Sequence, residues 1–336
     1  MKKHAIIPVF ISHRGCPNDC VFCNQKKITA RQGDVTKQDV INTIETYMST
    51  LKDMNLECIE ISFYGGSFTG IPIKEQNEYL SIAYEYKKKG IIDKIHMSTR
   101  PDYINREILD NLKRFEVDVI ELGVQSFADD VLLASNRGHT SDAVYAACDL
   151  IKEYGFTLGI QLMVGLPGDS KETCIYSARE TVKIKPELAR IYPTVIIDDT
   201  ELLEMYRRGE YNALSLEDAI DISKEMYLIL DEAGINIMRV GLKSTDIINE
   251  NGAVTGNTYH PAFRQLVEGQ IARERIEAQI DDEDKEITVY CNPMDISNAA
   301  GHKACNKAYF KEKYPGLKMG FKADDSIERN TYVVVE

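Results

Sequence analysis

Short apolar runs alternate with longer amphipathic stretches through the first two thirds of the chain. Runs rich in β-branched residues predict strands, and apolar residues spaced three and four apart predict helices. Their regular alternation indicates parallel strands joined by crossover helices. We expect strands near Ile6–Ile11, Cys58–Phe63, Lys94–Met97, Asp118–Gly123, Thr157–Val164 and Ala189–Tyr192, and helices near Lys37–Leu51, Lys74–Lys88, Asn105–Phe115, Ser141–Tyr154 and Ser170–Ile184.

The ends of several predicted helices carry capping residues. Thr36 and Ser141 stand where an N-cap belongs, because their hydroxyls can accept a bond from a free backbone N–H group. Gly90 and Gly155 stand where the chain must leave a helix. These residues support the predicted helix boundaries.

Unusual residues follow the predicted strands. Carboxyl ends of parallel strands meet at one face of a sheet or barrel, where enzymes of these folds build their sites. The pattern therefore predicts one shared site at this face. The segments concerned are the cysteine-containing loop 12–23, Tyr64–Phe68, Ser98–Asp102, Val124–Phe127, Gly165–Gly168 and Tyr192–Thr194.

The pattern changes after about residue 245, and we expect two domains, 1–245 and 246–336. The second has the pattern of a small α+β extension. Its expected elements are a helix from His260 to Ile280, a strand Ile287–Cys291, a helix from Asp295 to Tyr314, and strands Leu317–Phe321 and Thr331–Val335.

Three lysines in the second of these helices have helical spacing. Lys303, Lys307 and Lys311 are four residues apart, so a continuous helix would place them on one face. Such a stripe is usually a solvated face, and the alternative is a patch that contacts phosphates.

Composition limits the possible functions. The chain has 336 residues, 43% hydrophobic and 28% charged, which is ordinary for a globular protein. The net charge of -13 argues against non-specific coating of nucleic acid, although a local basic patch remains compatible with it. No apolar run is long enough to span a membrane, and the N-terminal apolar run is too short for a secretory signal. We expect a cytoplasmic protein without a membrane partner.

The densest chemical signal is the stretch Cys16-Pro17-Asn18-Asp19-Cys20-Val21-Phe22-Cys23. It supplies three thiolates. A [4Fe-4S] cluster held by only three cysteines keeps one iron open, and an open iron can bind and activate a ligand. A structural zinc site of the same cysteines with His13 is the alternative.

Other residues near the strand ends could hold a ligand. The Gly65-Gly66 pair can expose backbone N–H and C=O groups, or it can form an ordinary tight turn. Arg100 and Arg137 could clamp a carboxylate, because a guanidinium offers a planar fork of donors. An isolated arginine is more often a surface residue or a charge at a helix end.

Three more candidates are recognised by their surroundings. Gln125 and Gln161 are polar residues in apolar runs, so they need hydrogen-bond partners if buried, from a cofactor or from nearby backbone. Phe22, next to the third cysteine, could pack beside an adenine ring or fill the core.

With these residues in place, the chain resembles the radical S-adenosylmethionine (SAM) superfamily, and within it the radical SAM domain of the Elongator catalytic subunit. The resemblance spans about residues 5–245. It implies a partial (β/α)6 TIM-like barrel, a [4Fe-4S] cluster on Cys16, Cys20 and Cys23, and SAM held by Gly65, Gly66 and Ser67 with Gln125, Arg137 and Gln161. The motifs that carry it are Thr99–Tyr103, Glu121–Ser126, Asn136–Thr140 and Ile191–Thr194.

The chain departs from the Elongator pattern in three ways. Elongator has a longer gap between its first two cluster cysteines, whereas the short gap here is that of the wider superfamily, including the similar anaerobic coproporphyrinogen oxidases. Ser98 stands where Elongator has a glutamate. The resemblance does not include the acetyltransferase domain, so carboxymethylation of tRNA through acetyl-CoA is not implied.

The resemblance implies an enzyme that reductively cleaves SAM to a 5'-deoxyadenosyl radical. Its electron donor would be of the flavodoxin or ferredoxin type, in a reducing, anaerobic cytoplasm. RNA, and tRNA in particular, is the favoured substrate. A small metabolite or tetrapyrrole is the alternative, and a non-catalytic iron-sulfur or zinc protein is the alternative of another class.

Overall fold

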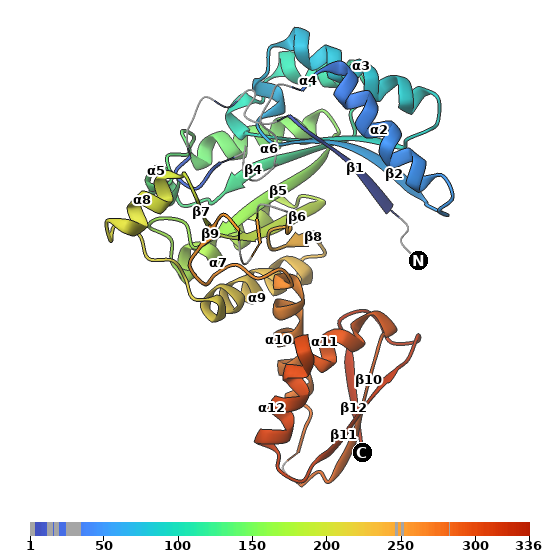
Figure 1. Ribbon diagram of the computed structural model, residues 1–336, viewed down its shortest axis with the longest axis vertical. Helices are drawn as coiled ribbons and strands as arrows, with labels where there is room; N and C mark the ends of the chain where they lie inside the picture. Colours follow the sequence, from blue (N-terminus) through green and yellow to red (C-terminus); the bar gives the residue numbers. More distant parts are fainter. Residues whose placement is uncertain are drawn as a thin grey trace.

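A curved sheet forms the larger part of the molecule (Figure 1). The computed structural model describes residues 4–11, 16, 20–24, 35–245, 248–249, 252–281 and 283–336. Among these residues, seven parallel strands form one sheet in the order β1-β2-β3-β4-β5-β6-β8. The predicted partial barrel is confirmed, with β8 as a strand that the sequence pattern does not predict. The strands are β1 (His4–Phe10), β2 (Cys58–Tyr64), β3 (Lys94–Thr99), β4 (Val119–Gln125), β5 (Thr157–Val164), β6 (Leu188–Pro193) and β8 (Asn236–Val240).

Helices connect the strands and cover the outer face of the sheet (Figure 1). The five predicted helices of this region are confirmed to within a residue or so at each end. None of the described helices is long and apolar enough to cross a membrane. The helices of this part are α2 (Lys37–Leu51), α3 (Ile73–Lys88), α4 (Arg106–Arg114), α5 (Asp129–Ala134), α6 (Ser141–Glu153), α7 (Lys171–Ile184), α8 (Glu201–Arg207) and α9 (Leu216–Glu232), with single 3-10 turns η1 (Phe68–Gly70) and η2 (Pro101–Tyr103) and a short ladder of β7 (Ile196–Ile197) with β9 (Val254–Thr255).

Capping residues set several helix ends. Thr36 accepts a bond from the N–H of Asp39, and the Asp39 carboxylate accepts one from the Thr36 N–H, which makes a capping box. Gly90 and Gly155 take positive φ values of 67° and 70° just after α3 and α6, as predicted. The prediction for Ser141 is wrong by one residue, because the N-cap of α6 is Thr140.

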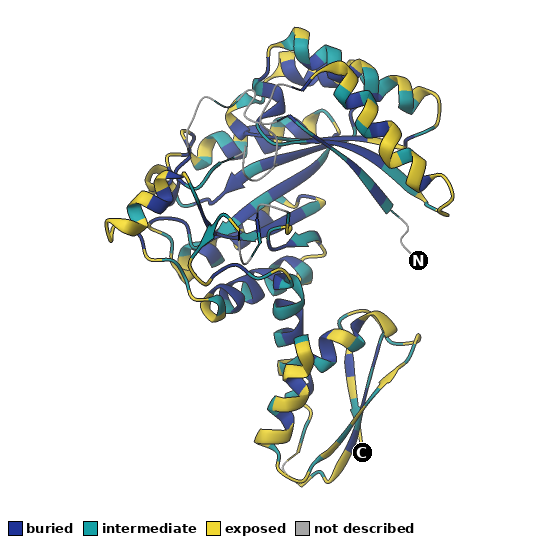
Figure 2. Ribbon diagram, viewed as in Figure 1, coloured by how far each residue is buried: buried dark blue, intermediate teal, exposed yellow. Residues whose placement is uncertain are grey.

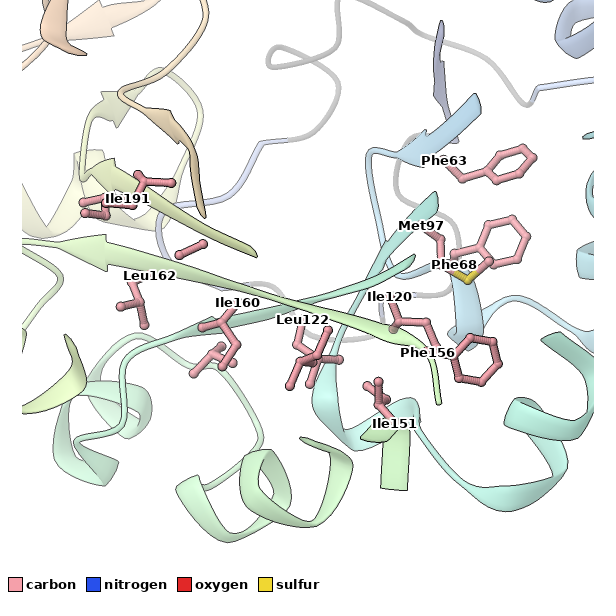
Figure 3. Close-up of a cluster of buried hydrophobic side chains, with 14 of the residues drawn as sticks. Phe63, Phe68, Met97, Ile120, Leu122, Ile151, Phe156, Ile160, Leu162 and Ile191 are labelled. Carbon is pink, nitrogen blue, oxygen red and sulfur yellow. The ribbon is translucent and has the colours of Figure 1, made fainter. Parts of the chain in front are cut away.

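The main core lies between the sheet and its helices. Figure 3 shows Ile120, Leu122, Ile160 and Leu162 with Ile151 of α6 among these buried side chains. Residues of this kind alternate along each strand with residues that face the concave side of the sheet. The side chains at the intervening positions of each strand therefore line the concave side, which is the lumen of the half-barrel.

The C-terminal part forms a smaller sheet with its own core, attached through α10 (Figure 1). Helix α10 contributes Val267 and Ile271 to the barrel core and Ile276 to the small core. The domain division at residues 245 and 246 stays a prediction. Many residues of this C-terminal part are exposed to solvent (Figure 2). The elements are α10 (Phe263–Glu277), β10 (Glu286–Cys291), η3 (Pro293–Asp295), α11 (Ile296–Ala300), η4 (His302–Ala304), α12 (Cys305–Lys313), β11 (Lys318–Ala323) and β12 (Tyr332–Val335), with strand order β11-β10-β12.

The predicted continuous helix from Asp295 to Tyr314 is wrong. The chain leaves helical geometry after α11, and Lys303 and Ala304 adopt φ values of 50° and 61°. Lys303 therefore does not share a helix with Lys307 and Lys311. The Lys307 ammonium lies 5.1 Å from the ring centre of Phe321. The three lysines do not form the single helical stripe expected from their spacing.

Candidate active site

Three cysteines lie just beyond the carboxyl end of β1. Cys20 is buried, and Cys16 and Cys23 are half-buried. The N–H of Cys23 donates to the carbonyl of Cys20 at 2.9 Å, which closes a tight turn between them. His13, the proposed fourth zinc ligand, lies outside the described residues. No described set of three His, Cys, Asp or Glu side chains is already gathered as a metal site, so a cluster assignment depends on the cysteine spacing and the charges around it.

The turn that carries Cys20 and Cys23 is tied to two other loops. The N–H of Val21 donates to the carbonyl of Ser135, which ends α5, and the carbonyl of Val21 accepts from the N–H of Leu202 at the start of α8. Phe22 packs in a small apolar cluster with Leu202 and its neighbours. Its predicted contact with adenine stays a prediction.

Two guanidinium groups converge on the thiol of Cys20. Arg137 NH1 lies 3.1 Å from the Cys20 sulfur, and Arg100 NH1 lies 4.0 Å from it. Arg137 also donates to the carbonyl of Gly123 at the end of β4. Hydrogen bonds to the sulfur ligands are one of the ways in which a protein tunes an iron-sulfur cluster. The surroundings of Cys20 therefore suit a cluster ligand.

Arg100 is less available to a ligand than the sequence suggests. Its Nε and Nη2 atoms donate to the two carboxylate oxygens of Asp102, each at 2.9 Å. The Nη2 atom also donates to the carbonyl of Arg137. Burial tends to lower the pKa of Arg100, but Asp102, with smaller contributions from the Cys20 and Cys16 thiolates, raises it overall. The predicted contact of Arg100 with SAM stays a prediction. In the structure, its guanidinium lies between Asp102 and Cys20.

The loop after β2 is held in place by hydroxyl groups. Gly65 has a φ of 92°, a conformation that favours glycine. The Ser67 hydroxyl is fully buried, lies 2.8 Å from the Thr99 hydroxyl and accepts from the N–H of Arg100 at 3.1 Å. Ser67 thus joins the ends of β2 and β3, while Gly65 and Gly66 are half-buried and their backbone is the part available to a ligand.

Gln125, at the end of β4, has two unusual properties. Its φ is 74°, a sparsely populated conformation for a residue with a side chain, and such strain gathers at functional sites. Its Oε1 is buried and accepts no hydrogen bond from the described residues. A Cβ at Gly123 would lie 3.2 Å from Gln125 Nε2 and 3.5 Å from Arg137 NH2, so glycine leaves room for both side chains. A bound ligand with a donor group would satisfy the Gln125 oxygen.

Deeper in the lumen lies a chain of buried charges, which we call the lumen network: Glu60, His96, Glu121 and Arg190. His96 Nδ1 lies 2.7 Å from a Glu60 oxygen, and its Nε2 lies 3.4 Å from a Glu121 oxygen. Arg190 Nε donates to the same Glu121 oxygen at 2.7 Å. These residues come from β2, β3, β4 and β6, so the network crosses much of the sheet.

The network keeps its members charged despite burial. Burial opposes charge on His96, but its hydrogen bonds to Glu121 and Glu60 raise its pKa from 6.5 to about 9. Burial likewise tends to raise the pKa of Glu121, but the charge of Arg190 and the bond from His96 lower it to about 2. Two carboxylates and two cations therefore compensate one another near neutral pH.

Gln161 lies beside this network. Its Nε2 donates to Glu121 and lies 3.3 Å from the Ser98 hydroxyl. Its predicted role as a SAM contact stays a prediction, and in the structure it supports Glu121. The sequence analysis missed the four network residues. Charged residues at alternate positions within apolar strands could have revealed them.

Comparison with known proteins identifies the family. The model of the radical SAM superfamily matches residues 10–180, just over half of the chain, and the model of the radical SAM C-terminal domain matches residues 186–273. Together these matches run from β1 into α10.

Curated relatives carry Elongator-type names. The tRNA uridine(34) acetyltransferase of Methanocaldococcus jannaschii is 26% identical over 258 residues, which cover 65% of this chain and 47% of that protein. Elongator complex protein 3 of Homo sapiens is 27% identical over 188 residues, which cover 50% of this chain and 34% of that protein. The chain thus spans about half or less of the length of these relatives.

A solved structure shares the fold. The Elp3 of Methanocaldococcus infernus, solved with an N-terminal deletion, superposes with a TM-score of 0.67 at 20% identity, covering 82% of this chain and 64% of that one. Members of the family bind a [4Fe-4S] cluster and SAM. The matched segments, the half-barrel and the placement of the cysteines at its carboxyl face all agree, and the chain belongs to the radical SAM superfamily of enzymes.

Proposed function

We propose that this chain binds a [4Fe-4S] cluster through Cys16, Cys20 and Cys23, binds SAM beside it, and modifies RNA, specifically tRNA. The observation that carries the first two parts is the approach of Arg137 to the Cys20 thiol at 3.1 Å. Close by, Gln125 presents a buried oxygen that no described residue satisfies. This set of residues fits both groups, because hydrogen-bond donors lie beside a cysteine sulfur and a buried polar acceptor awaits a ligand donor.

The residues around the thiol then have distinct tasks. Arg137 donates to the Cys20 sulfur and fixes the end of β4 through the Gly123 carbonyl. Gln125 accepts a hydrogen bond from SAM, and the backbone at Gly65 and Gly66 binds its polar end. When bound, the cluster supplies the electron that cleaves SAM to methionine and a 5'-deoxyadenosyl radical, which removes a hydrogen atom from the substrate.

The lumen network provides the polar wall of the substrate site. Arg190 donates to the Tyr64 hydroxyl at 2.9 Å and lies 3.3 Å from the Tyr192 hydroxyl. Burial raises the pKa of Tyr64 to about 12, so this hydroxyl stays protonated and can donate to a substrate. Because Glu121 accepts a hydrogen bond from Arg190 and lies against His96, these groups are positioned before the substrate arrives.

Two considerations favour tRNA as the substrate. The relatives named tRNA uridine(34) acetyltransferase share the barrel region with this chain. The last strand of the barrel, β8, also borders a cationic groove, which is described below. A flavodoxin or ferredoxin type protein would supply the electron, in a reducing cytoplasm. Because the chain matches only about half of these relatives, the reaction on tRNA is not taken from them.

The test is mass spectrometry of tRNA nucleosides from a deletion strain and from strains that carry the wild-type gene, Cys20→Ala or Cys305→Ala. We expect one nucleoside to disappear on deletion while a simpler precursor accumulates. The wild-type gene and Cys305→Ala, which changes an exposed cysteine outside the loop, should restore it, and Cys20→Ala should not. Purified Cys20→Ala protein should lose iron and form at least about 100-fold less 5'-deoxyadenosine.

Two results would contradict the proposal. Unchanged nucleosides in the deletion strain would remove tRNA as the substrate and direct attention to a small metabolite or tetrapyrrole. Cys20→Ala protein that still cleaves SAM would remove the cluster assignment itself.

A further inference from the structure

A groove lies where the last barrel strand meets the small domain. Its volume is about 780 Å³, within the range of about 300–1,000 Å³ for small-molecule sites. One wall is the end of β8 with the segment that follows it, and the other is formed by the start of α11 and the loop before β12. The groove therefore includes the carboxyl end of β8, the last strand of the barrel sheet. The residues used below are Arg239, Lys243, Arg264, Glu268, Asn298 and Arg329.

The groove is cationic although the protein carries a net charge of -13. Four of its lining residues are Arg or Lys, and Glu268 is the one carboxylate among those that line it in the described part of the chain. Glu268 is already engaged, because it accepts from Arg264 Nε at 2.7 Å and from Asn298 Nδ2 at 3.0 Å. Among the residues that line the groove, positive charge therefore exceeds negative charge.

Two of the cations are free to meet a ligand. Arg239 is half-buried and Lys243 is exposed, and neither forms an ion pair with a described residue. Arg329 is held by its Nε on the buried carboxylate of Asp295, at 2.9 and 3.0 Å, which positions its guanidinium at the groove. One guanidinium fixed in place beside two unpaired cations suits a ligand with several anionic groups in a row better than a ligand with a single carboxylate.

Arg239 lines the groove and belongs to the strand that neighbours Arg190 of the lumen network. Arg239 is the register partner of Arg190 on the neighbouring strand, so both side chains point to the concave side. Burial raises the pKa of Tyr192, and the positive charges of Arg190 and Arg239 oppose that rise. Arg239 therefore lies near both the lumen network and the groove.

We infer that this groove binds the sugar-phosphate backbone of the RNA strand whose target nucleotide enters the lumen. The inference rests on the proposed function and names the surface that holds the substrate. Phosphate contacts fix the position and register of a nucleic acid without reading its sequence. A groove beside the lumen would place the backbone on Arg239, Lys243 and Arg329 while the base reaches the lumen network.

The experiment measures binding of fluorescently labelled bulk tRNA to the full chain by anisotropy over a series of salt concentrations. The test variant is Arg239→Glu/Lys243→Glu. The matched control is Lys52→Glu/Lys74→Glu, which changes the net charge equally at two exposed lysines on the outer helices. We expect the test variant to bind at least about tenfold more weakly, with a salt slope smaller by roughly 1.4 to 1.8, and the control to match wild type.

Two kinds of result would contradict the proposal. Equal losses of affinity in the test and control variants, or no loss in either, would overturn the proposed role of the groove but leave the proposed RNA substrate in place. Failure of the wild-type chain to bind tRNA would overturn the proposed substrate and the groove together. Lys243→Glu alone, at an exposed position after β8, covers the case in which the double variant does not fold, and it should reduce the slope by roughly 0.7 to 0.9.

Discussion

The mouth of the half-barrel and its lumen solve the burial of polar groups in opposite ways. At the mouth, Gln125 is strained and its oxygen lacks a partner among the described residues, while Arg137 faces a thiol. In the lumen, Glu121 and His96 are fully buried, yet each has an oppositely charged partner within 3.4 Å. We propose that a ligand completes the mouth, whereas in the lumen opposite charges offset one another within the chain.

This difference separates residues that bind from residues that position. A buried group without a partner costs free energy until a ligand satisfies it, so its mutation changes binding more than folding. A compensated buried network costs free energy when any one member is removed, so its mutation changes folding first. Three variants test this division.

The largest effect is expected for Glu121→Ala. Its removal leaves Arg190 and His96 buried without their shared carboxylate, and we expect the free energy of unfolding to fall by about 3–5 kcal/mol. Urea denaturation measures this. The control is Glu153→Ala, which breaks an exposed two-point contact with Arg106 and should leave the free energy of unfolding close to that of wild type. Similar losses for the two variants would show that the lumen network does not stabilise the fold.

A smaller effect is expected from pH. The pKa of His96 is raised from 6.5 to about 9 in the folded chain, so protonated His96 stabilises the fold fully below pH 6.5 and progressively less up to about pH 9. The stability difference between wild type and His96→Gln should fall by about 3 kcal/mol between pH 6 and pH 9.5. His4, which also faces Glu60, is present in both proteins and cancels in the difference. A difference independent of pH would mean that His96 is neutral in the folded chain.

The smallest effect is expected for Gln125→Ala, and it separates the two regions most sharply. The change should weaken SAM binding by roughly 3- to 10-fold, the value of one hydrogen bond, as measured by equilibrium dialysis on reconstituted protein. Without SAM, its unfolding free energy should stay within about 1 kcal/mol of wild type, because the lost oxygen has no partner among the described residues. Unchanged SAM affinity would place the cofactor elsewhere.

The sequence predicts the barrel well because strand and helix periodicity is local. It does not predict β8, whose five residues include Asn236 and Arg239 and lack a long apolar run. It also misses the break after α11, which tertiary packing imposes. A Cβ at Gly301 would lie 2.6 Å from the Cys305 sulfur, and Asn306 Nδ2 donates to the Asn298 and Ala299 carbonyls that a continuous helix would use.

The candidate site divides in the same way. Cys20, Gln125 and Arg137 could be singled out because their residue types are unusual at strand ends, and the structure brings them together. The ion pairs of Glu121 could not be predicted, because they join β4 to β3 and β6 and depend on the order of strands in the sheet. The spacing of residues along one segment indicates which chemistry a residue can perform. Only the folded structure shows which residue on another strand it contacts.

Helix α10 makes the width of the groove a property of the folded chain rather than of a hinge. Its Val267 and Ile276 are fully buried in different cores. They are separated by less than three turns of continuous helix, with no loop between them to bend. The two cores should unfold in one cooperative transition, and the RNA strand that we propose for the groove would meet walls already set at their working distance.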